Sequence, residues 1–406
     1  MSSLPNLNVG APDVPYFTPA QLPPAGTAKA KQNNDNPIPS LFQPIDIGDL
    51  KMQNRIVVSP MCQYSAMDGF VTPWHSAHLG GIFTRGPGLT FTEATAVTAN
   101  GRISPEDAGI WSDAHAQAWS PIVQFAHSQN QKIAMQLGHA GRKSSTCAPW
   151  INGGRNASSV EERGWPGDTW APSPIPYVDG WPTPNELDRE GIDAVVAAFK
   201  EGARRALSVG FDALEIHGAH GYLISTFLSP TSNQRTDEYG GSFENRIRLA
   251  LEIVDAVRSV MPSTMPLFFR ISASEGIEEV SPDALGWTVS DTVRLAPILA
   301  QHGVNVLDVS AGGINPKQHF HVGPAYQAPM AVAVKKANSG LLVGTVGNIT
   351  DGLLAQSVLD AQQADLIFCG RAFQYNPGTV LAFAQALDVQ IHQAHQIEWG
   401  YKPPRK

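Results

Sequence analysis

The chain has 406 residues, of which 42% are hydrophobic and 16% are charged, and its formal net charge is -8 at pH 7. This length suits one large domain or two ordinary ones, because α/β barrels regularly exceed about 200 residues. The negative net charge argues against a partner that presents a phosphate backbone, so nucleic acid is not an expected ligand.

The sequence does not begin with a basic segment followed by an apolar one, and no run of about 18 uninterrupted apolar residues appears later. The three cysteines, Cys62, Cys147 and Cys369, lie far apart, so neither a CxxC metal pair nor a disulfide framework is predicted. We therefore expect a cytoplasmic protein in a reducing compartment, with no membrane span.

The first part of the chain, residues 1–39, is rich in Pro, Asn, Ala and Gln. It has no helical or strand period that could bury one face, so we expect an extended N-terminal arm that need not be ordered. Residues 40–385 are expected to form the folded domain, and residues 386–406 a C-terminal tail.

Apolar, β-branched runs recur through residues 40–385 and predict strands. There are eight such runs, at residues 55–61, 89–94, 132–137, 213–217, 266–270, 306–310, 341–344 and 365–370. Amphipathic segments lie between them. One helix is predicted from Asp188, a suitable N-cap, to Gly210, a suitable stop, and another over residues 245–261.

This alternation of strands and helices predicts a parallel sheet whose outer face is covered. Eight repeats favour closure into a (β/α)8 TIM barrel, and a doubly wound open sheet is the alternative. A barrel would place function at the carboxyl ends of its strands.

One connection, residues 141–187, is too long for a plain barrel loop. It contains Trp150, Trp165, Trp170 and Trp181 among many Pro and Gly residues. Long loops in compact domains are usually functional or disordered, so we expect a capping loop that packs through its indoles.

Two histidines and a tyrosine, His217, His220 and Tyr222, follow the fourth apolar run. One interpretation is a metal site, but the nearby sequence has no HExxH and no further ligand at a useful spacing. A second is a structural histidine pair. The third is a pair of hydrogen-bond donors aimed at a carbonyl or phenolate oxygen, with Tyr222 as proton donor, since a phenol with a pKa near 10 is a competent donor at neutral pH.

Other strands also end in polar groups. Gln136 lies in the third run, Arg270 closes the fifth, and Gly370 and Arg371 close the eighth. In barrels the loops after strands seven and eight often hold a phosphate, which glycine backbone and an arginine fork can bind. The alternative for Arg371 is a surface ion pair.

Three long motifs carry a resemblance to a known family. They are SPMCQYS at residues 59–65, QLGHAGRK at residues 136–143 and HGAHGYLISTFLSPTSNQRTDEYGGSFENR at residues 217–246. Together they resemble the old yellow enzyme family of FMN-dependent ene-reductases, and the resemblance extends from about Pro39 to Asn376.

The resemblance implies a barrel that binds FMN in its mouth, takes hydride from NADPH or NADH, and passes it to an activated alkene such as an enone. It assigns His217 and His220 to the substrate oxygen, Tyr222 to protonation of the α-carbon, and Tyr64 to substrate contact. Arg270 would face the pyrimidine edge of the flavin. The FMN-binding residues that it implies are Ser59, Pro60, Met61, Cys62, Ala94, Gln136, Arg270, Gly347, Gly370 and Arg371.

Cys62 followed by Tyr64 resembles the subclass called thermophilic-like, which implies a homodimer. Members of that subclass often end in a segment whose arginine enters the neighbouring subunit's site. Here Trp399 takes the place of that arginine, so the dimer contact is not carried over. The sequence also lacks a convincing GxGxxG between a strand and a helix, which agrees with a nicotinamide that visits the alkene pocket in alternation.

The leading hypothesis is therefore an FMN-dependent, NAD(P)H-oxidising ene-reductase with ping-pong kinetics. The alternative on the same fold is a flavin-dependent tailoring enzyme or isomerase of secondary metabolism. Two hypotheses from other classes are a metal-dependent barrel hydrolase that uses His217 and His220, and a non-catalytic ligand-binding barrel.

Overall fold

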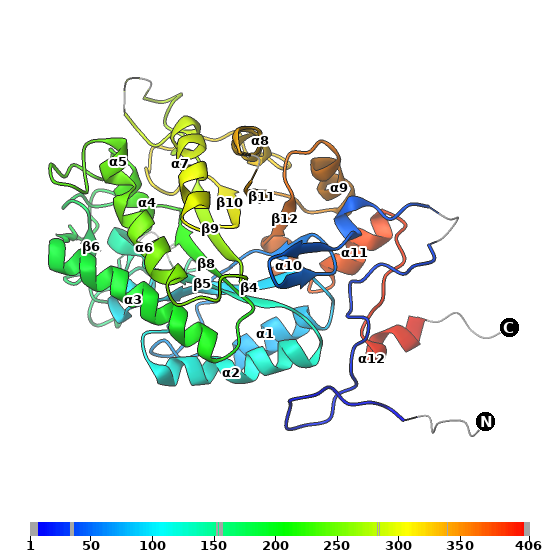
Figure 1. The fold of residues 1–406 in the computed structure, drawn as a ribbon. Coiled ribbons are helices and arrows are strands. Elements are labelled where there is room, and N and C mark those ends of the chain that lie inside the picture. The colour runs from blue at the N-terminus through cyan, green and yellow to red at the C-terminus, as the bar shows by residue number, and fades with distance from the viewer. Residues whose placement is uncertain are drawn as a thin grey trace, which may run out of the picture.

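The computed structural model describes residues 7–32, 36–151, 153, 157–281, 283, 285–338 and 340–401. Its centre is a closed barrel of parallel strands in which sequence neighbours are also spatial neighbours (Figure 1). The strands are β3 (Ile56–Val58), β4 (Leu89–Ala96), β5 (Ile133–Gly138), β8 (Ala213–Gly218), β9 (Leu267–Ser272), β10 (Val306–Ser310), β11 (Leu342–Thr345) and β12 (Leu366–Cys369). Each predicted apolar run lies on one of them, and the (β/α)8 prediction is confirmed over the open sheet.

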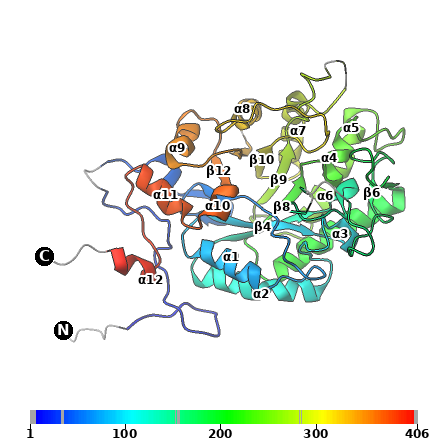
Figure 2. The same ribbon diagram turned by 180° about the vertical axis from the view of Figure 1, so that it is seen from behind.

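Helices surround the barrel in both views (Figures 1 and 2). They are α1 (Pro73–Phe83), α2 (Asp113–Ser128), α3 (Arg189–Ser208), α4 (Leu223–Leu228), α5 (Phe243–Arg246), α6 (Arg248–Arg258), α7 (Val289–Gln301), α8 (Ala328–Ala337), α9 (Gly352–Asp360), α10 (Arg371–Tyr375), α11 (Thr379–Ala386) and α12 (His395–Glu398). As predicted, Asp188 caps α3, and its carboxylate accepts a hydrogen bond from the Gly191 N–H at 2.8 Å. The helix predicted over residues 245–261 is divided between α5 and α6, because Ser242 caps a separate first turn. None of the helices in the described ranges is long and apolar enough to cross a membrane.

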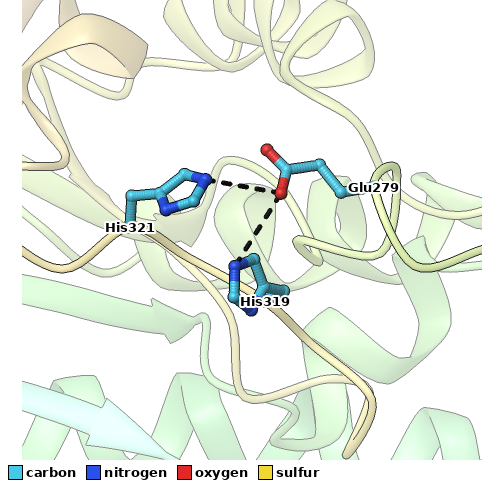
Figure 3. Close-up of side chains that lie close together, drawn as sticks. All are labelled: Glu279, His319 and His321. Atoms are coloured by element: carbon cyan, nitrogen blue, oxygen red, sulfur yellow. Dashed lines mark ion pairs between the residues drawn. The ribbon is translucent and has the colours of Figure 1, made fainter.

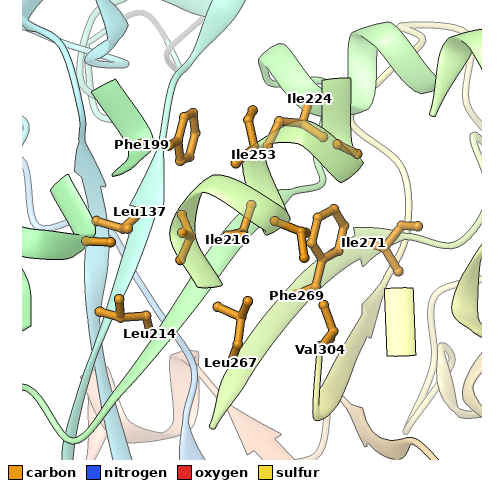
Figure 4. Close-up of a cluster of buried hydrophobic side chains, with 14 of the residues drawn as sticks. Leu137, Phe199, Leu214, Ile216, Ile224, Ile253, Leu267, Phe269, Ile271 and Val304 are labelled. Carbon is orange, nitrogen blue, oxygen red and sulfur yellow. The ribbon is translucent and has the colours of Figure 1, made fainter. Parts of the chain in front are cut away.

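Side chains alternate along each strand, and this alternation decides which residues enter the barrel. On β8, Leu214 and Ile216 point outward into the layer shared with α3 and α6, as Figure 4 shows. On β9, Leu267, Phe269 and Ile271 do the same. The residues between them therefore point inward, which explains why polar side chains can sit within these apolar strands.

The amino-terminal end of the barrel is closed by a short hairpin of β1 (Ile45–Ile47) and β2 (Leu50–Met52). Ile47, Leu50 and Met52 pack against inward residues at the start of the strands, among them Phe91 and Phe268. These side chains fill the interior of the barrel at the amino-terminal ends of its strands. A ligand can therefore enter the barrel only at the carboxyl ends of the strands.

The described parts of the arm, residues 7–32 and 36–39, contain no named helix or strand. The arm lies beside the C-terminal tail, near the α12 label in Figure 1. Backbone hydrogen bonds of 2.8 Å join Gly26 to His392 and Lys29 to Gln390. These bonds fix the N-terminal arm and the C-terminal tail against each other.

Candidate functional site

A cavity of about 750 Å³ opens at the carboxyl end of the barrel. Many of the predicted site residues line it, namely Pro60, Met61, Cys62, Tyr64, Ala94, Gln136, His217, His220, Tyr222 and Arg270. These residues come from β3, β4, β5, β8 and β9 or from the segments that follow them. One cavity thus brings together residues that are far apart in the sequence.

A smaller cavity of about 190 Å³ adjoins the first, since Met61 and Arg270 line both. It contains the remaining predicted residues, which are Ser59, Gly347, Gly370 and Arg371. Arg371 donates to the Asn348 side-chain oxygen at 2.7 Å. The residues predicted for a phosphate are therefore next to those predicted for a ring system.

The small cavity has the features of a cradle for an elongated ligand. A side chain at Gly370 would place its Cβ 2.7 Å from the Met61 sulfur, so a larger residue here would displace the Met61 side chain, which lines both cavities. Gly347 has φ +120°, which L side chains rarely adopt. The buried Gln327 Oε1 has no hydrogen-bond partner among the described residues, so it remains available to a ligand hydroxyl or bound water.

Beneath the large cavity, inward residues of four neighbouring strands form a polar layer. Gln136 Nε2 donates to Glu215 Oε1 at 2.8 Å, and Arg270 Nε lies 3.1 Å from Asp308 Oδ2. Glu215 and Asp308 are both fully buried, with one arginine between them. Burial, and then the charge of Asp308, raise the pKa of Glu215, so its neutral carboxyl is the form that fits. Burial raises the pKa of Asp308 as well, and the charge of Arg270 at 3.1 Å opposes that rise, so Asp308 is the carboxyl that we assign to the ion pair.

His217 and His220 lie with their rings 5.2 Å apart and nearly perpendicular. His217 Nδ1 accepts from the Ala219 N–H at 3.3 Å, so the ring proton is on Nε2. His220 Nε2 lies 2.7 Å from the Ser310 hydroxyl, which leaves Nδ1 as the donor when that hydroxyl donates. Burial, and then the charge of Arg270, hold the pKa of each imidazole well below its ordinary value. Both rings are therefore neutral at pH 7.

Tyr222 lies against the same pair, with its ring 5.0 Å from that of His217. Its hydroxyl has no hydrogen-bond partner among the described residues, although the residue lines the cavity. Burial raises its pKa well above the ordinary phenol value, so it keeps its proton. The turn before it requires Gly221, whose φ is +74° and whose added Cβ would lie 1.9 Å from the Gly313 carbonyl oxygen.

Cys62 and Tyr64 also line this cavity. Burial, and then the nearby carboxyls of Asp107 and Glu93, raise the pKa of Cys62, so it is a thiol rather than a thiolate. Tyr64 packs edge to face with Trp150, and the centres of the two rings lie 5.5 Å apart. Trp150 also lines the cavity, so the long segment 141–187 reaches the cavity through this indole.

One cation near the histidine pair was not among the predicted site residues. Lys143 donates to the backbone oxygens of His220 at 2.9 Å and Gly313 at 3.1 Å. Its ammonium lies 5.3 Å from the centre of the Tyr222 ring. Burial, and then Arg142, lower its pKa to about 7. A lysine shortly after a strand is most often solvent-exposed, so only its position in the QLGHAGRK motif could have indicated this role.

The metal hypothesis gains no support at this cavity. Among the residues that the structure describes, the one group of three close metal-ligand side chains is Glu279, His319 and His321, and it includes neither His217 nor His220.

Comparison with known proteins agrees with the fold and with the resemblance found in the sequence. Residues 40–390 match the NADH:flavin oxidoreductase / NADH oxidase family. An NADH:flavin oxidoreductase of Gibberella zeae is 48% identical over 406 aligned residues, covering 97% of this chain and 96% of the relative. An NADPH dehydrogenase of Bacillus subtilis is 40% identical over 363 residues, covering 89% of this chain and 99% of the relative.

Among solved structures, morphinone reductase in complex with tetrahydroNAD is similar, with a TM-score of 0.68 and 26% identity. The match covers 88% of this chain and 93% of that one. A 2-naphthoyl-CoA reductase complex has a TM-score of 0.75 at 19% identity, over 86% of this chain and 52% of that one, and this likeness concerns the fold alone.

Proposed function

Because the chain belongs to the NADH:flavin oxidoreductase / NADH oxidase family, we propose that it reduces the activated C=C bond of α,β-unsaturated carbonyl compounds by a ping-pong reaction with NAD(P)H. The chain is an oxidoreductase, its cofactor is FMN, and the resemblance to the old yellow enzyme family is confirmed. The observation that carries the substrate proposal is the cavity itself, in which two neutral imidazoles lie beside a phenol whose hydroxyl has no hydrogen-bond partner in the described part of the chain.

The two adjoining cavities suit FMN, with the ring system in the larger and the phosphate in the smaller. We propose that Arg371, with backbone at Gly347 and Gly370, holds the phosphate, and that Arg270 presents its cation to the edge of the ring system. The other proposed contacts to the cofactor are Ser59, Pro60, Met61, Cys62, Ala94 and Gln136. Bound there, FMN would supply hydride transfer between NAD(P)H and the substrate's β-carbon.

The histidine pair would bind the carbonyl oxygen of the substrate. Donation from His217 Nε2 and from His220 withdraws electron density from the β-carbon and stabilises the negative charge that develops on the oxygen. A single preorganised donor of this kind is typically worth about 2.7–4 kcal/mol. Tyr222 then gives its proton to the α-carbon, so that one hydride and one proton are added across the double bond. Tyr64, which lines the same cavity, would also contact the substrate.

The visible spectrum of the purified protein tests this proposal. We expect a yellow protein that bleaches with NADPH or NADH in the absence of oxygen and recolours when 2-cyclohexenone is added. Bleaching without recolouring by any enone would leave the cofactor in place and reject the substrate class. Deuteride supplied on the nicotinamide should appear at the product's β-carbon, whereas a redox-neutral isomerisation would consume no nicotinamide.

Lys143 gives the enone half-reaction a predicted dependence on pH. Below its pKa of about 7 it is an ammonium close to Tyr222 and the histidine pair, where it stabilises negative charge on the substrate oxygen and on the phenol. As the pH rises through 7 that charge is lost, so the rate of re-oxidation by enone should fall. Stopped-flow rates between pH 5.5 and 9 should show this step in the wild type and not in Lys143→Met. Lys29→Met is the control, because Lys29 pairs with Glu398 at the tail. An unchanged profile in Lys143→Met would contradict the assignment.

A further inference from the structure

Three side chains outside the residues that line the two cavities form a second possible site (Figure 3). Glu279 belongs to the segment after β9, and His319 and His321 to the segment after β10. We propose that they bind one divalent transition-metal ion, of which Zn²⁺ is the representative, and that the ion links these two segments.

The distances suit such an ion. Glu279 Oε2 lies 3.8 Å from His319 Nε2 and 3.5 Å from His321 Nε2, and the three ligand atoms lie within 4.8 Å of one another. Ligands of a tetrahedral zinc ion, bound at about 2.0–2.2 Å, lie about 3.4 Å apart. All three side chains are exposed, so small rotations bring them to this spacing without disturbing a core. Two imidazoles and a carboxylate are ligands that Zn²⁺ shares with other first-row metals, and water completes the shell.

The backbone already presents both imidazoles on one side. His319 and His321 flank Phe320, and the centres of their two rings lie 5.0 Å apart. The Phe320 ring packs closely on two glycines. A Cβ added at Gly276 would lie 2.4 Å from this ring, and a Cβ added at Gly312 would lie 2.9 Å from it. Phe320 therefore anchors the segment, and the two histidines face away from it together.

A backbone contact fixes the two segments near the proposed ion. The His319 N–H donates to the Gly276 carbonyl oxygen at 2.6 Å. Glu279 follows Gly276 within the same loop, so its carboxylate is carried toward the two imidazoles. Much of the geometry is thus present before the metal binds, and less conformational entropy is lost on binding.

The link would affect a segment that lines the smaller cavity and contacts His220, a residue of the larger one. It begins at Ser310, whose hydroxyl pairs with His220, and ends near Tyr326, which lines the smaller cavity. Binding of the ion is expected to stabilise the folded protein, because it ties this segment to the neighbouring loop.

Zinc titration of the FMN-loaded protein tests the proposal. Isothermal titration with ZnCl2 is expected to show one ion bound per chain, with affinity at least tenfold weaker in each of His319→Gln, His321→Gln and Glu279→Gln. The matched control is His127→Gln, because His127 also pairs with one carboxylate, Asp212, at 3.0 Å, and forms no such group of three ligands with the residues that the structure describes. Its affinity should equal that of the wild type.

Two further measurements make the result decisive. ZnCl2 should raise the thermal unfolding midpoint of the wild type and of His127→Gln, and leave that of His321→Gln unchanged. Zinc affinity should also weaken on acidification, because only the deprotonated imidazole binds the ion. Absence of zinc binding by the wild type, or equal affinity in the wild type and His321→Gln, would overturn the proposal. None of these readouts depends on enone reduction, so the two proposals can fail separately.

Discussion

Replacing Tyr222 with phenylalanine is expected to slow re-oxidation of the reduced protein by 2-cyclohexenone by about 10²–10⁴-fold, the range typical for loss of a general acid. Bleaching by NADPH should be nearly unchanged, because that step needs no proton from this phenol. The variant should also fold normally, since the hydroxyl has no hydrogen-bond partner among the described residues and its loss leaves no buried group unpaired. Stopped-flow absorbance of each half-reaction separates the two effects.

The control for this experiment is Tyr375→Phe, which removes a hydroxyl from a side chain that is 94% exposed. Both half-reactions should then match those of the wild type. If Tyr222→Phe itself re-oxidises at the wild-type rate, Tyr222 is not the proton donor, and another group supplies the proton to the α-carbon.

Replacing Arg270 with methionine is expected to destabilise the FMN-free protein by about 3–5 kcal/mol, because it removes one partner of a buried ion pair. Asp308 would then be left fully buried beside Glu215, with no cation to balance its charge. The same change should weaken FMN binding, because Arg270 lines both cavities. Urea unfolding of the FMN-free protein and quenching of flavin fluorescence measure the two effects.

The double variant Arg270→Met/Asp308→Asn separates structure from cofactor binding. Removing the uncompensated charge should restore most of the lost stability, while FMN affinity stays low. If the double variant is as unstable as the single one, the unpaired carboxylate is not the cause of the loss.

Much of the fold follows from the sequence because the strands are short, continuous apolar runs and the helices between them are amphipathic. The sequence also indicates polar residues such as Gln136, His217 and Arg270, because a polar residue within an apolar run or at its end is easily recognised. It does not by itself assign a role to Glu215 or Asp308. Their place in one layer depends on the register, in which His217 pairs with Arg270 and Arg270 with Asp308.

Contacts between loops are harder to predict than strands. Glu279 and His321 lie close together because the Phe320 ring packs on Gly276 in the segment after β9. No periodicity in the sequence predicts this contact between two loops. Lys143 is similar, since its partners are backbone oxygens at His220 and Gly313, whose positions depend on two other loops. The length and tryptophan content of segment 141–187 predict a cap, but not that Trp150 is the residue that meets Tyr64.

The hairpin of β1 and β2 has a kinetic consequence. Its side chains close the barrel at the amino-terminal ends of the strands. The nicotinamide and the alkene must therefore both enter through the cavity at the carboxyl ends. NADPH in excess should therefore bind the reduced protein and block the enone. Enone in excess should bind the oxidised protein and block NADPH. We expect substrate inhibition by NADPH that rising enone concentration relieves.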